Sequence, residues 1–251
     1  MSAANGPMSA AARETALAAA AGVDGWLTDA QARRLHARAA AASGTIVEIG
    51  SFRGRSTIVL ALAAAANFEI VAIDPHAGSD RGPRELARDA ARGDDDHAAL
   101  HANLAAAGIA DRVRHVRLPS AAALGDVTGP VALLYVDGAH RLAPARDDIA
   151  RWGARVAPGG VMLVHDAFSS VGVTLALLAE CVLRDGWRYA GRTGSLAEYE
   201  RVASPRARNA ARQLAELPWF ARNVLLKALV LVHLRPLAHR LGLPAGMHWP
   251  Y

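Results

Sequence analysis

Short apolar runs and longer segments of helical spacing alternate along most of this chain. Apolar runs bounded by glycine, proline or charged residues are typical of buried parallel strands. They predict strands at 45–49, 69–73, 113–117, 133–136 and 161–164. Apolar residues spaced three or four apart predict helices between them, at 56–66, 98–107, 143–154 and 174–184. A last pair of runs, 187–190 and 198–202, predicts a closing hairpin.

This alternation predicts an α/β fold: a Rossmann-like, doubly wound and mostly parallel seven-stranded sheet with helices on both faces. Two further helices are expected ahead of the sheet at 9–21 and 28–42, the second one capped by Thr28. We divide the chain into an N-terminal helical cap (1–43), a main α/β domain (44–202) and a basic, apolar helical C-terminal extension (203–251).

The length of 251 residues fits one large domain or a domain with an appendage, and the 52% of hydrophobic residues suffice for a core. The net charge of +5 is unevenly spread. Residues 201–251 hold eight Lys or Arg and one acid, Glu216, a local net of +7, which leaves −2 for the first 200 residues. The basic tail indicates an interaction surface, and we expect no nucleic-acid partner.

The single cysteine, Cys181, excludes an intrachain disulfide and favours a reducing compartment, so we expect a cytoplasmic protein. Arg13, Glu14 and Asp24 interrupt the alanine-rich start, and we therefore expect no signal peptide. No uncharged apolar run approaches the roughly 18 residues that a membrane span requires.

The first strand runs into a glycine-bearing loop, Val47-Glu-Ile-Gly-Ser-Phe-Arg-Gly-Arg-Ser-Thr57. Gly50 allows a tight turn and Gly54 lets the next helix begin beside a ligand. Asp74 ends the following strand, where nucleotide-binding folds place an acid that binds a ribose. The pattern favours a nucleoside-containing ligand over an ordinary strand–turn–helix joint with a capping serine.

Two later strands each end in a carboxylate, Asp137 and Asp166, and His140 follows three residues after the first. Ligands of parallel sheets bind at the carboxyl ends of the strands, so these side chains are expected to converge. The carboxylates suit Mg²⁺ and His140 suits a general base. Helix caps are one alternative. An iron site that includes His165 is another, although strand alternation sends His165 and Asp166 to opposite faces.

Phe52 stands where a dinucleotide fold needs a glycine beside its pyrophosphate, and a third glycine is missing. A nicotinamide-dependent Rossmann oxidoreductase is therefore disfavoured but stays open as an alternative. Glu48, just before the loop, suits a cationic or amine-bearing ligand better than a phosphate.

The glycine loop, together with Tyr135-Val-Asp-Gly-Ala-His140, the segment 147–152 and Ala157-Pro-Gly-Gly-Val-Met-Leu-Val-His-Asp166, resembles class I S-adenosylmethionine-dependent methyltransferases. Over residues 44–202 the pattern is similar to the metal-dependent small-molecule and sugar O-methyltransferase branch (macrolide-sugar O-methyltransferase-like). The resemblance implies S-adenosyl-L-methionine as cofactor, Mg²⁺ on Asp137 and Asp166, and His140 as base, where catechol-type relatives carry lysine. It implies cofactor contacts from Glu48, Gly50, Ser51, Gly54, Ser56, Asp74 and Ser120.

We therefore expect an enzyme that methylates a hydroxyl of a small molecule or saccharide. For the tail, a dimer contact or packing on the core is favoured over an anionic membrane surface at the inner face. A non-catalytic, membrane-peripheral protein is the remaining alternative. Residues 22–31 fit either a substrate cover or a docked helix, and 75–97 fit either a lid or a solvated loop.

Overall fold

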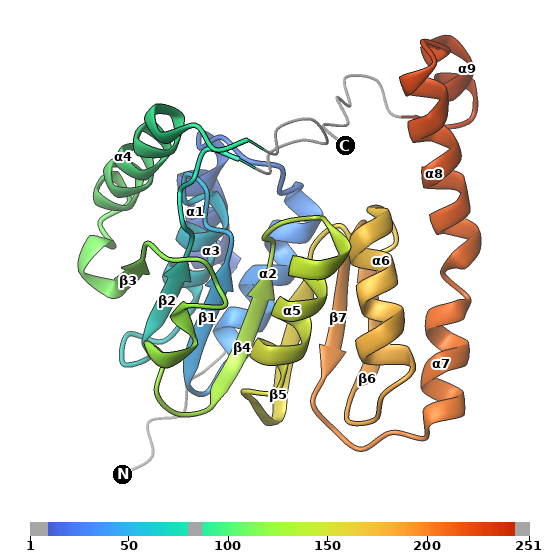
Figure 1. Ribbon diagram of the computed structural model, residues 1–251. Helices are drawn as coiled ribbons and strands as arrows, with labels where there is room; N and C mark the ends of the chain where they lie inside the picture. The colour runs from blue at the N-terminus through green and yellow to red at the C-terminus, as the bar shows by residue number, and fades with distance from the viewer. Residues whose placement is uncertain (1–9, 80–86, 244–251) are drawn as a thin grey trace.

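A seven-stranded sheet forms the centre of the computed structural model, which describes residues 10–79 and 87–243 (Figure 1). The strand order is β3-β2-β1-β4-β5-β7-β6. Strands β1 to β5 are parallel and β7 pairs antiparallel with both β5 and β6. This confirms the predicted fold class. The strands are β1 Thr45–Ile49, β2 Ile70–Ile73, β3 Val113–Val116, β4 Val131–Val136, β5 Val156–Val164, β6 Arg188–Thr193 and β7 Leu196–Glu200.

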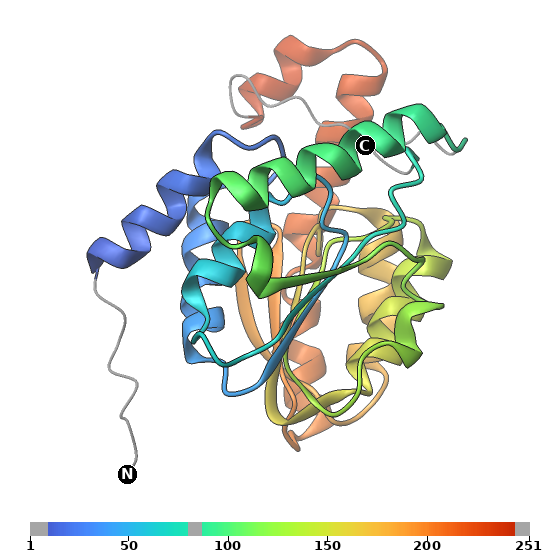
Figure 2. The ribbon, with the colours of Figure 1, turned by 90° about the vertical axis from the view of Figure 1, so that its left-hand side faces the viewer.

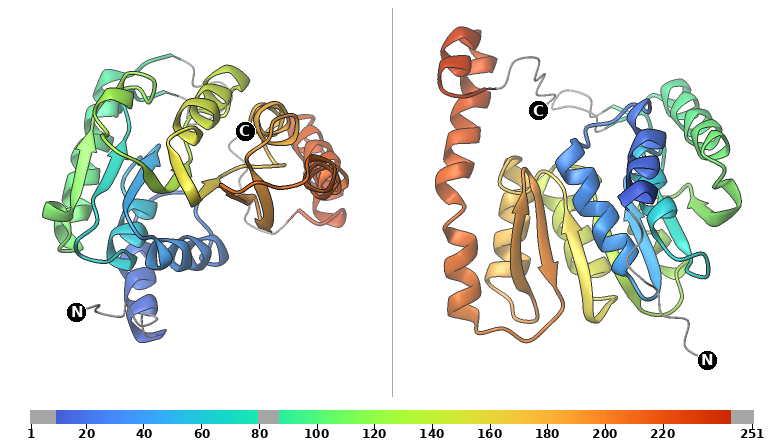
Figure 3. Two further views of the ribbon diagram at one scale, coloured as in Figure 1. Left: turned by 90° about the horizontal axis from the view of Figure 1, so that it is seen from below. Right: turned by 180° about the vertical axis from the view of Figure 1, so that it is seen from behind.

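Helices cover both faces of the sheet, as the side view and the view from behind show (Figure 2, Figure 3). One face carries α1 Ala10–Ala21, α2 Asp29–Ala41, α3 Arg55–Ala63 and α4 Ala90–Ala106. The other carries α5 Leu142–Gly153 and α6 Val171–Leu177, which continues as a π-turn over Leu178–Val182. The edge beyond β6 is lined by α7 Arg206–Leu214 and α8 Leu217–Leu231, followed by α9 Arg235–Arg240.

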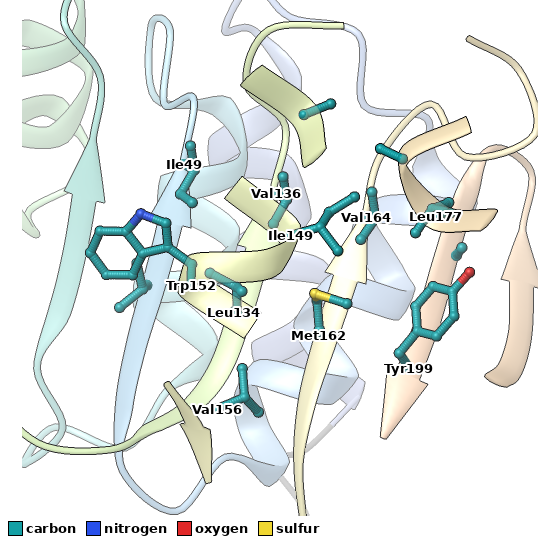
Figure 4. Packing of buried hydrophobic residues seen from close by; sticks show 14 of the residues in the cluster. Ile49, Leu134, Val136, Ile149, Trp152, Val156, Met162, Val164, Leu177 and Tyr199 are labelled. Atoms are coloured by element: carbon teal, nitrogen blue, oxygen red, sulfur yellow. The ribbon is translucent and has the colours of Figure 1, made fainter. Parts of the chain in front are cut away.

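Each face has its own hydrophobic core. Leu134 of β4 and Met162 of β5 pack beneath Ile149 and Trp152 of α5, with Tyr199 of β7 beside them (Figure 4). All five of these side chains are fully buried. The α5 helix is thus packed on both β4 and β5.

The helix α2 begins as the sequence predicts. The Thr28 hydroxyl accepts from the Gln31 backbone N–H, and the Gln31 side chain accepts from the Thr28 backbone at 2.9 Å, so both halves of a capping box are present. Gln31 also donates to the Ser195 hydroxyl at 3.1 Å, which ties the N-terminal helices to the β6–β7 hairpin.

The prediction of a polar loop up to residue 97 was wrong for 90–97, because α4 already begins at Ala90. Asp89 caps this helix by accepting from the Arg92 N–H at 3.1 Å. Gly93, which reads as a loop residue, lies inside the helix, where an added Cβ would stand 2.0 Å from the His76 carbonyl oxygen. Tertiary contact therefore selects this glycine. The predicted lid includes 80–86, which lie outside the described residues.

The first half of the C-terminal extension packs against the main domain. Asn209 of α7 accepts from the Tyr189 N–H at 2.7 Å, and the Tyr199 hydroxyl donates to Gln213 at 3.0 Å. Beyond these contacts α8 runs past the end of the sheet, toward the side where the parallel strands end (Figure 1). Among the helices that the structure describes, none has the length and apolarity needed to cross a membrane.

Candidate functional site

A cavity of about 270 Å³ opens at the carboxyl ends of the parallel strands. The loops after β1, β2 and β4 line it, together with the N-terminal segment 24–27 and part of α5. Seven of the predicted site residues line this cavity: Gly50, Ser51, Ser56, Asp74, Ser120, Asp137 and His140.

Gly50 holds the loop after β1 against the end of β4. Its φ is +85°, and an added Cβ would lie 2.1 Å from the Asp137 carbonyl oxygen. Only glycine allows this approach without moving the backbone. The glycine that the sequence assigned to a tight turn thus sets the distance between the loop and Asp137.

Asp74 is fixed in place by the backbone. One carboxylate oxygen accepts from the Phe52 N–H at 2.9 Å and the other from the His76 N–H at 2.8 Å. Each oxygen keeps a further lone pair for a ligand hydroxyl. Asp74 thus presents two acceptors to the cavity in one geometry.

Glu48 does not line the cavity. It is fully buried behind the loop, where it accepts hydrogen bonds from the Ser56 and Thr57 hydroxyls at the start of α3. Burial raises the pKa of Glu48 to about 8, and the nearby charges of Asp137 and Asp74 also favour the protonated acid.

Gly54 also lies away from the cavity wall. It precedes α3 with φ +92°, and an added Cβ would stand 2.8 Å from a methyl of Leu100 in α4. Its space is therefore needed for packing of α3 on α4. Glu48 and Gly54 therefore support the glycine loop from the side away from the cavity.

Ser51 and Ser120 differ in their hydrogen bonding. The Ser51 hydroxyl is buried and has no hydrogen-bond partner among the residues that the structure describes. The Ser120 hydroxyl donates to Asp148, and its carbonyl accepts from the Trp152 indole at 3.1 Å. Burial raises the pKa of Asp148 to about 6.

Sequence reasoning did not assign Asp148 to the site. A signal was present, because Asp148 shares the helical spacing of the buried residues Ala145, Ile149 and Trp152. A carboxylate on the apolar face of a helix needs a partner, and here the partner is a predicted site residue.

The N-terminal segment covers one end of the cavity. The Trp26 ring lies 5.4 Å from that of Phe52, and Arg55 donates to the Gly25 carbonyl at 3.1 Å. Of the two interpretations of residues 22–31, their place at the cavity favours a cover.

Asp137, His140 and Asp166 come together as predicted, with ligand-capable atoms within 4.8 Å of one another. The His140 Nε2 lies 2.8 Å from Asp166 Oδ2, and the Tyr135 hydroxyl donates to Asp137 Oδ2 at 2.8 Å. Oxygen and imidazole donors at this spacing fit a divalent cation.

The argument that alternation separates His165 from Asp166 was wrong. Strand β5 ends at Val164, and Asp166 has φ +53°, which turns its side chain out of the strand pattern. The His165 Nδ1 lies 3.2 Å from Asp137 Oδ1 and 3.6 Å from Asp166 Oδ2.

Electrostatic interactions within this cluster shift the pKa values of His165 and Asp166. Burial alone would lower the pKa of His165, but the carboxylates of Asp137 and Asp166 raise it well above its usual value. Burial would raise the pKa of Asp166, and the two histidines instead hold it well below its usual range. Asp166 is therefore ionised near neutral pH, with protonated His165 as its counter-ion, a positive charge that a bound cation would replace.

Comparisons with known proteins bear on the domain family and on the fold. A family model described as a methyltransferase domain matches residues 47–167, which carry both the glycine loop and the carboxylate cluster. The cofactor-bound Rv0187 from MTB is 22% identical, with a TM-score of 0.51 over 77% of this chain and 90% of that one.

Two further structures share the fold. The methyltransferase PaMTH1 of Podospora anserina, bound to S-adenosylhomocysteine, is 15% identical, with a TM-score of 0.54 over 79% of this chain and 89% of that one. The O-methyltransferase NovP is 17% identical, with a TM-score of 0.52 over 69% and 80%. The match to a methyltransferase domain speaks against the oxidoreductase and the non-catalytic alternatives. Residues 47–167 of this chain form a methyltransferase domain of the class I, S-adenosylmethionine-dependent type.

Proposed function

We propose that this enzyme transfers the methyl group of S-adenosylmethionine to a hydroxyl oxygen of a small molecule or saccharide. One observation carries the proposal: Asp74, the acid expected at the cofactor ribose, and the pair Asp137 and His140 line the same cavity. A methyl donor and a hydroxyl acceptor bound there would be neighbours. Alignment of the two accounts for much of such a reaction, because the sulfonium methyl is already activated.

The cofactor side fits a nucleoside with a polar tail. Asp74 offers two fixed carboxylate oxygens for the ribose hydroxyls, and the unpartnered Ser51 hydroxyl offers a polar contact nearby. We assign direct contacts to these two residues and to Gly50, Ser56 and Ser120. For Glu48 and Gly54 we propose an indirect part, which is to hold the loop and the start of α3 in position.

We propose Asp137 and Asp166 as the ligands of Mg²⁺. Two carboxylates beside a solvent-reached cavity are the hard oxygen donors that Mg²⁺ prefers, and it keeps several waters. Such a cation lowers the pKa of an acceptor hydroxyl and orients it.

His140 is our general base. Its contact with Asp166 fixes the plane of the ring at the cavity wall. A base placed there can take the hydroxyl proton as the methyl group is transferred.

Substitution of Asp137 tests the metal role. Asp137→Asn should abolish turnover that depends on Mg²⁺, while binding of S-adenosylhomocysteine stays close to that of the wild type. The matched control is Asp111→Asn on an exposed turn, which should change neither quantity. Acceptors are screened by release of S-adenosylhomocysteine over a panel of hydroxylated compounds. Full turnover in the presence of a chelator would remove the metal role.

Substitution of His140 tests the base separately. His140→Gln should lower kcat about 100-fold or more with a small change in KM, and the loss should shrink as the pH rises. An unchanged kcat at neutral pH would contradict the assignment.

We propose that the distal tail forms a contact with a second copy of the chain and does not bind a lipid surface. Leu231, Leu234 and Leu237 are exposed there. Of the nearby cations, Lys227 donates to the Ser169 carbonyl at 2.7 Å and is turned inward. Arg222 is exposed, but its guanidinium donates to the Gly242 carbonyl at 2.7 Å. Light scattering on Leu231→Ser/Leu237→Ser should give a monomer where the wild type gives a dimer. Flotation of the wild type with anionic vesicles would favour the membrane instead.

Cytoplasmic action completes the proposal, since the lone Cys181 is a buried free thiol that suits a reducing compartment. Fractionation of cells that express the enzyme, with a known cytoplasmic marker, tests this location.

A further inference from the structure

Four histidines gather at the β3 edge of the sheet, outside the proposed methyl-transfer cluster. His97 and His101 lie one turn apart on α4, His115 lies on β3, and His76 follows β2. Their rings stand 4.6–5.4 Å apart, centroid to centroid. Figure 2 shows α4 crossing this edge of the sheet beside β3. Nothing in the proposed methyl transfer requires such a group.

Three of these histidines can reach one point. His97, His101 and His115 offer ring nitrogens that all lie within 4.8 Å of one another. The His97 and His101 Nε2 atoms are 3.2 Å apart. At most one proton can sit between two such nitrogens, whereas one cation can use both lone pairs. Two histidines four apart on a helix are also a spacing that zinc sites use.

The ring of His115, the third of these histidines, gives independent evidence for a ligand. The His115 Nε2 is buried and has no hydrogen-bond partner in the part of the chain that the structure describes. An imidazole nitrogen that is neither solvated nor hydrogen-bonded costs free energy, and a bound ion would remove that cost.

The charge state suits metal binding. Burial and the neighbouring histidines together lower the pKa of His115 to about 3, so this ring is neutral near pH 7. Burial also lowers the pKa of His97, with Arg117 as a second cause. Arg117 pairs with Asp94, and this ion pair weakens the repulsion between Arg117 and an incoming cation. Neutral imidazole is the form that binds metals.

We propose that His97, His101 and His115 bind one borderline transition-metal ion of the Zn²⁺ class, with solvent completing its coordination. Imidazole donors suit Zn²⁺, Ni²⁺ and Cu²⁺ rather than Mg²⁺, so this site and the carboxylate cluster select different ions. His101 is exposed, which leaves the site open to solvent.

The site has a structural link to the cofactor cavity through His76. This ring packs on His97 and His115, and its Nε2 donates to the Phe52 carbonyl at 2.8 Å. Its backbone N–H is one of the two donors that hold Asp74. An ion that joins α4 to β3 would therefore stiffen the wall behind Asp74.

Zinc binding measured by calorimetry tests the proposal without reference to activity. The starting protein carries Asp137→Asn and Asp166→Asn, which removes the carboxylate cluster, and is stripped with chelator and dialysed. It should bind one equivalent of Zn²⁺. Adding His97→Ala or His101→Ala should weaken binding about 100-fold or more, because a lost ligand costs at least as much as a lost outer-shell partner.

His233→Ala, on an exposed tail histidine, is the matched control and should leave binding unchanged. Thermal melting of each apo variant shows whether it is folded, and His101→Ala changes an exposed side chain. Co²⁺ titration gives a second readout, since its visible absorption should appear in the starting protein and be lost in His101→Ala. No zinc binding by the starting protein, or equal binding by the variants, would overturn the proposal.

Discussion

Replacement of Glu48 by Gln tests whether the buried acid behind the glycine loop is protonated. The Glu48 side chain is completely buried and contacts two hydroxyls, Ser56 and Thr57. Hydroxyl groups can donate or accept, so a glutamine amide satisfies the same geometry as a protonated acid. Glu48→Gln therefore mimics the neutral form at every pH.

The magnitude follows from the pKa. Folding raises the pKa of Glu48 from 4.5 to about 8. The folded protein keeps this proton while the unfolded chain loses it, so this contribution to stability is complete below pH 4.5 and falls as the pH rises toward 8. At 1.36 kcal/mol per pH unit the wild type loses up to about 5 kcal/mol across that window. Glu48→Gln lacks this loss.

Urea unfolding followed by circular dichroism at pH 5, 6, 7 and 8 measures the effect. The difference between Glu48→Gln and the wild type should be small at pH 5 and increase by roughly one kcal/mol per pH unit in favour of the variant. Glu69→Gln is the control, because Glu69 is exposed and paired with Arg114. Parallel stability curves for Glu48→Gln and the wild type would show that Glu48 is ionised, and the reasoning would be refuted.

Three further predictions concern residues that hold the site in position or cover it. Gly50→Ala places a Cβ 2.1 Å from the Asp137 carbonyl at positive φ and should cost about 3 kcal/mol or more in urea unfolding; a smaller cost would mean that the loop moves freely. Asn223→Ala removes the amide that donates to the Phe168 carbonyl at 3.2 Å, and it should lower the free energy of unfolding by about 1–3 kcal/mol. It should also lower kcat, because the segment after β5 loosens. A melting temperature equal to that of the wild type would contradict this. Trp26→Ala should weaken S-adenosylhomocysteine binding about 10-fold by calorimetry without lowering stability, and unchanged affinity would remove the cover role.

Local sequence signals predicted much of the fold. The short apolar runs gave all seven strands to within a few residues except β5, which begins earlier at Val156. Thr28 gave the start of α2, because a capping box is made by residues three apart. The start of α4 was missed, because Gly93 and three aspartates in a row look like loop residues. The space for Gly93 is set by His76, a contact that only the folded chain creates.

The features of the site also divide into those that local sequence signals predict and those that depend on the folded chain. Asp137, His140 and Asp166 could be predicted to converge, since parallel strands end at one edge of the sheet. The orientation of His165 could not, because it depends on the left-handed turn at Asp166. The burial of Glu48 behind the loop depends on how α3 packs, and no local pattern indicates it.

The histidine cluster could not be predicted from the sequence, for a related reason. His97 and His101 share a helical spacing, but His115 joins them only because β3 lies next to α4. Neighbours that come from separate elements carry no periodic signal in one sequence.

Titration of S-adenosylhomocysteine into the wild type and into Asp74→Asn tests the central claim most directly. Asp74→Asn keeps the shape of the side chain but removes the charge and one acceptor oxygen that the ribose hydroxyls need. Calorimetry should give one equivalent bound by the wild type and at least about 10-fold weaker binding by the variant. The variant should stay folded but melt at a lower temperature, because its amide NH2 cannot accept from the backbone N–H of Phe52 or of His76. Absence of binding to the wild type, or equal affinity in the two proteins, would contradict the assignment of this cavity to the cofactor.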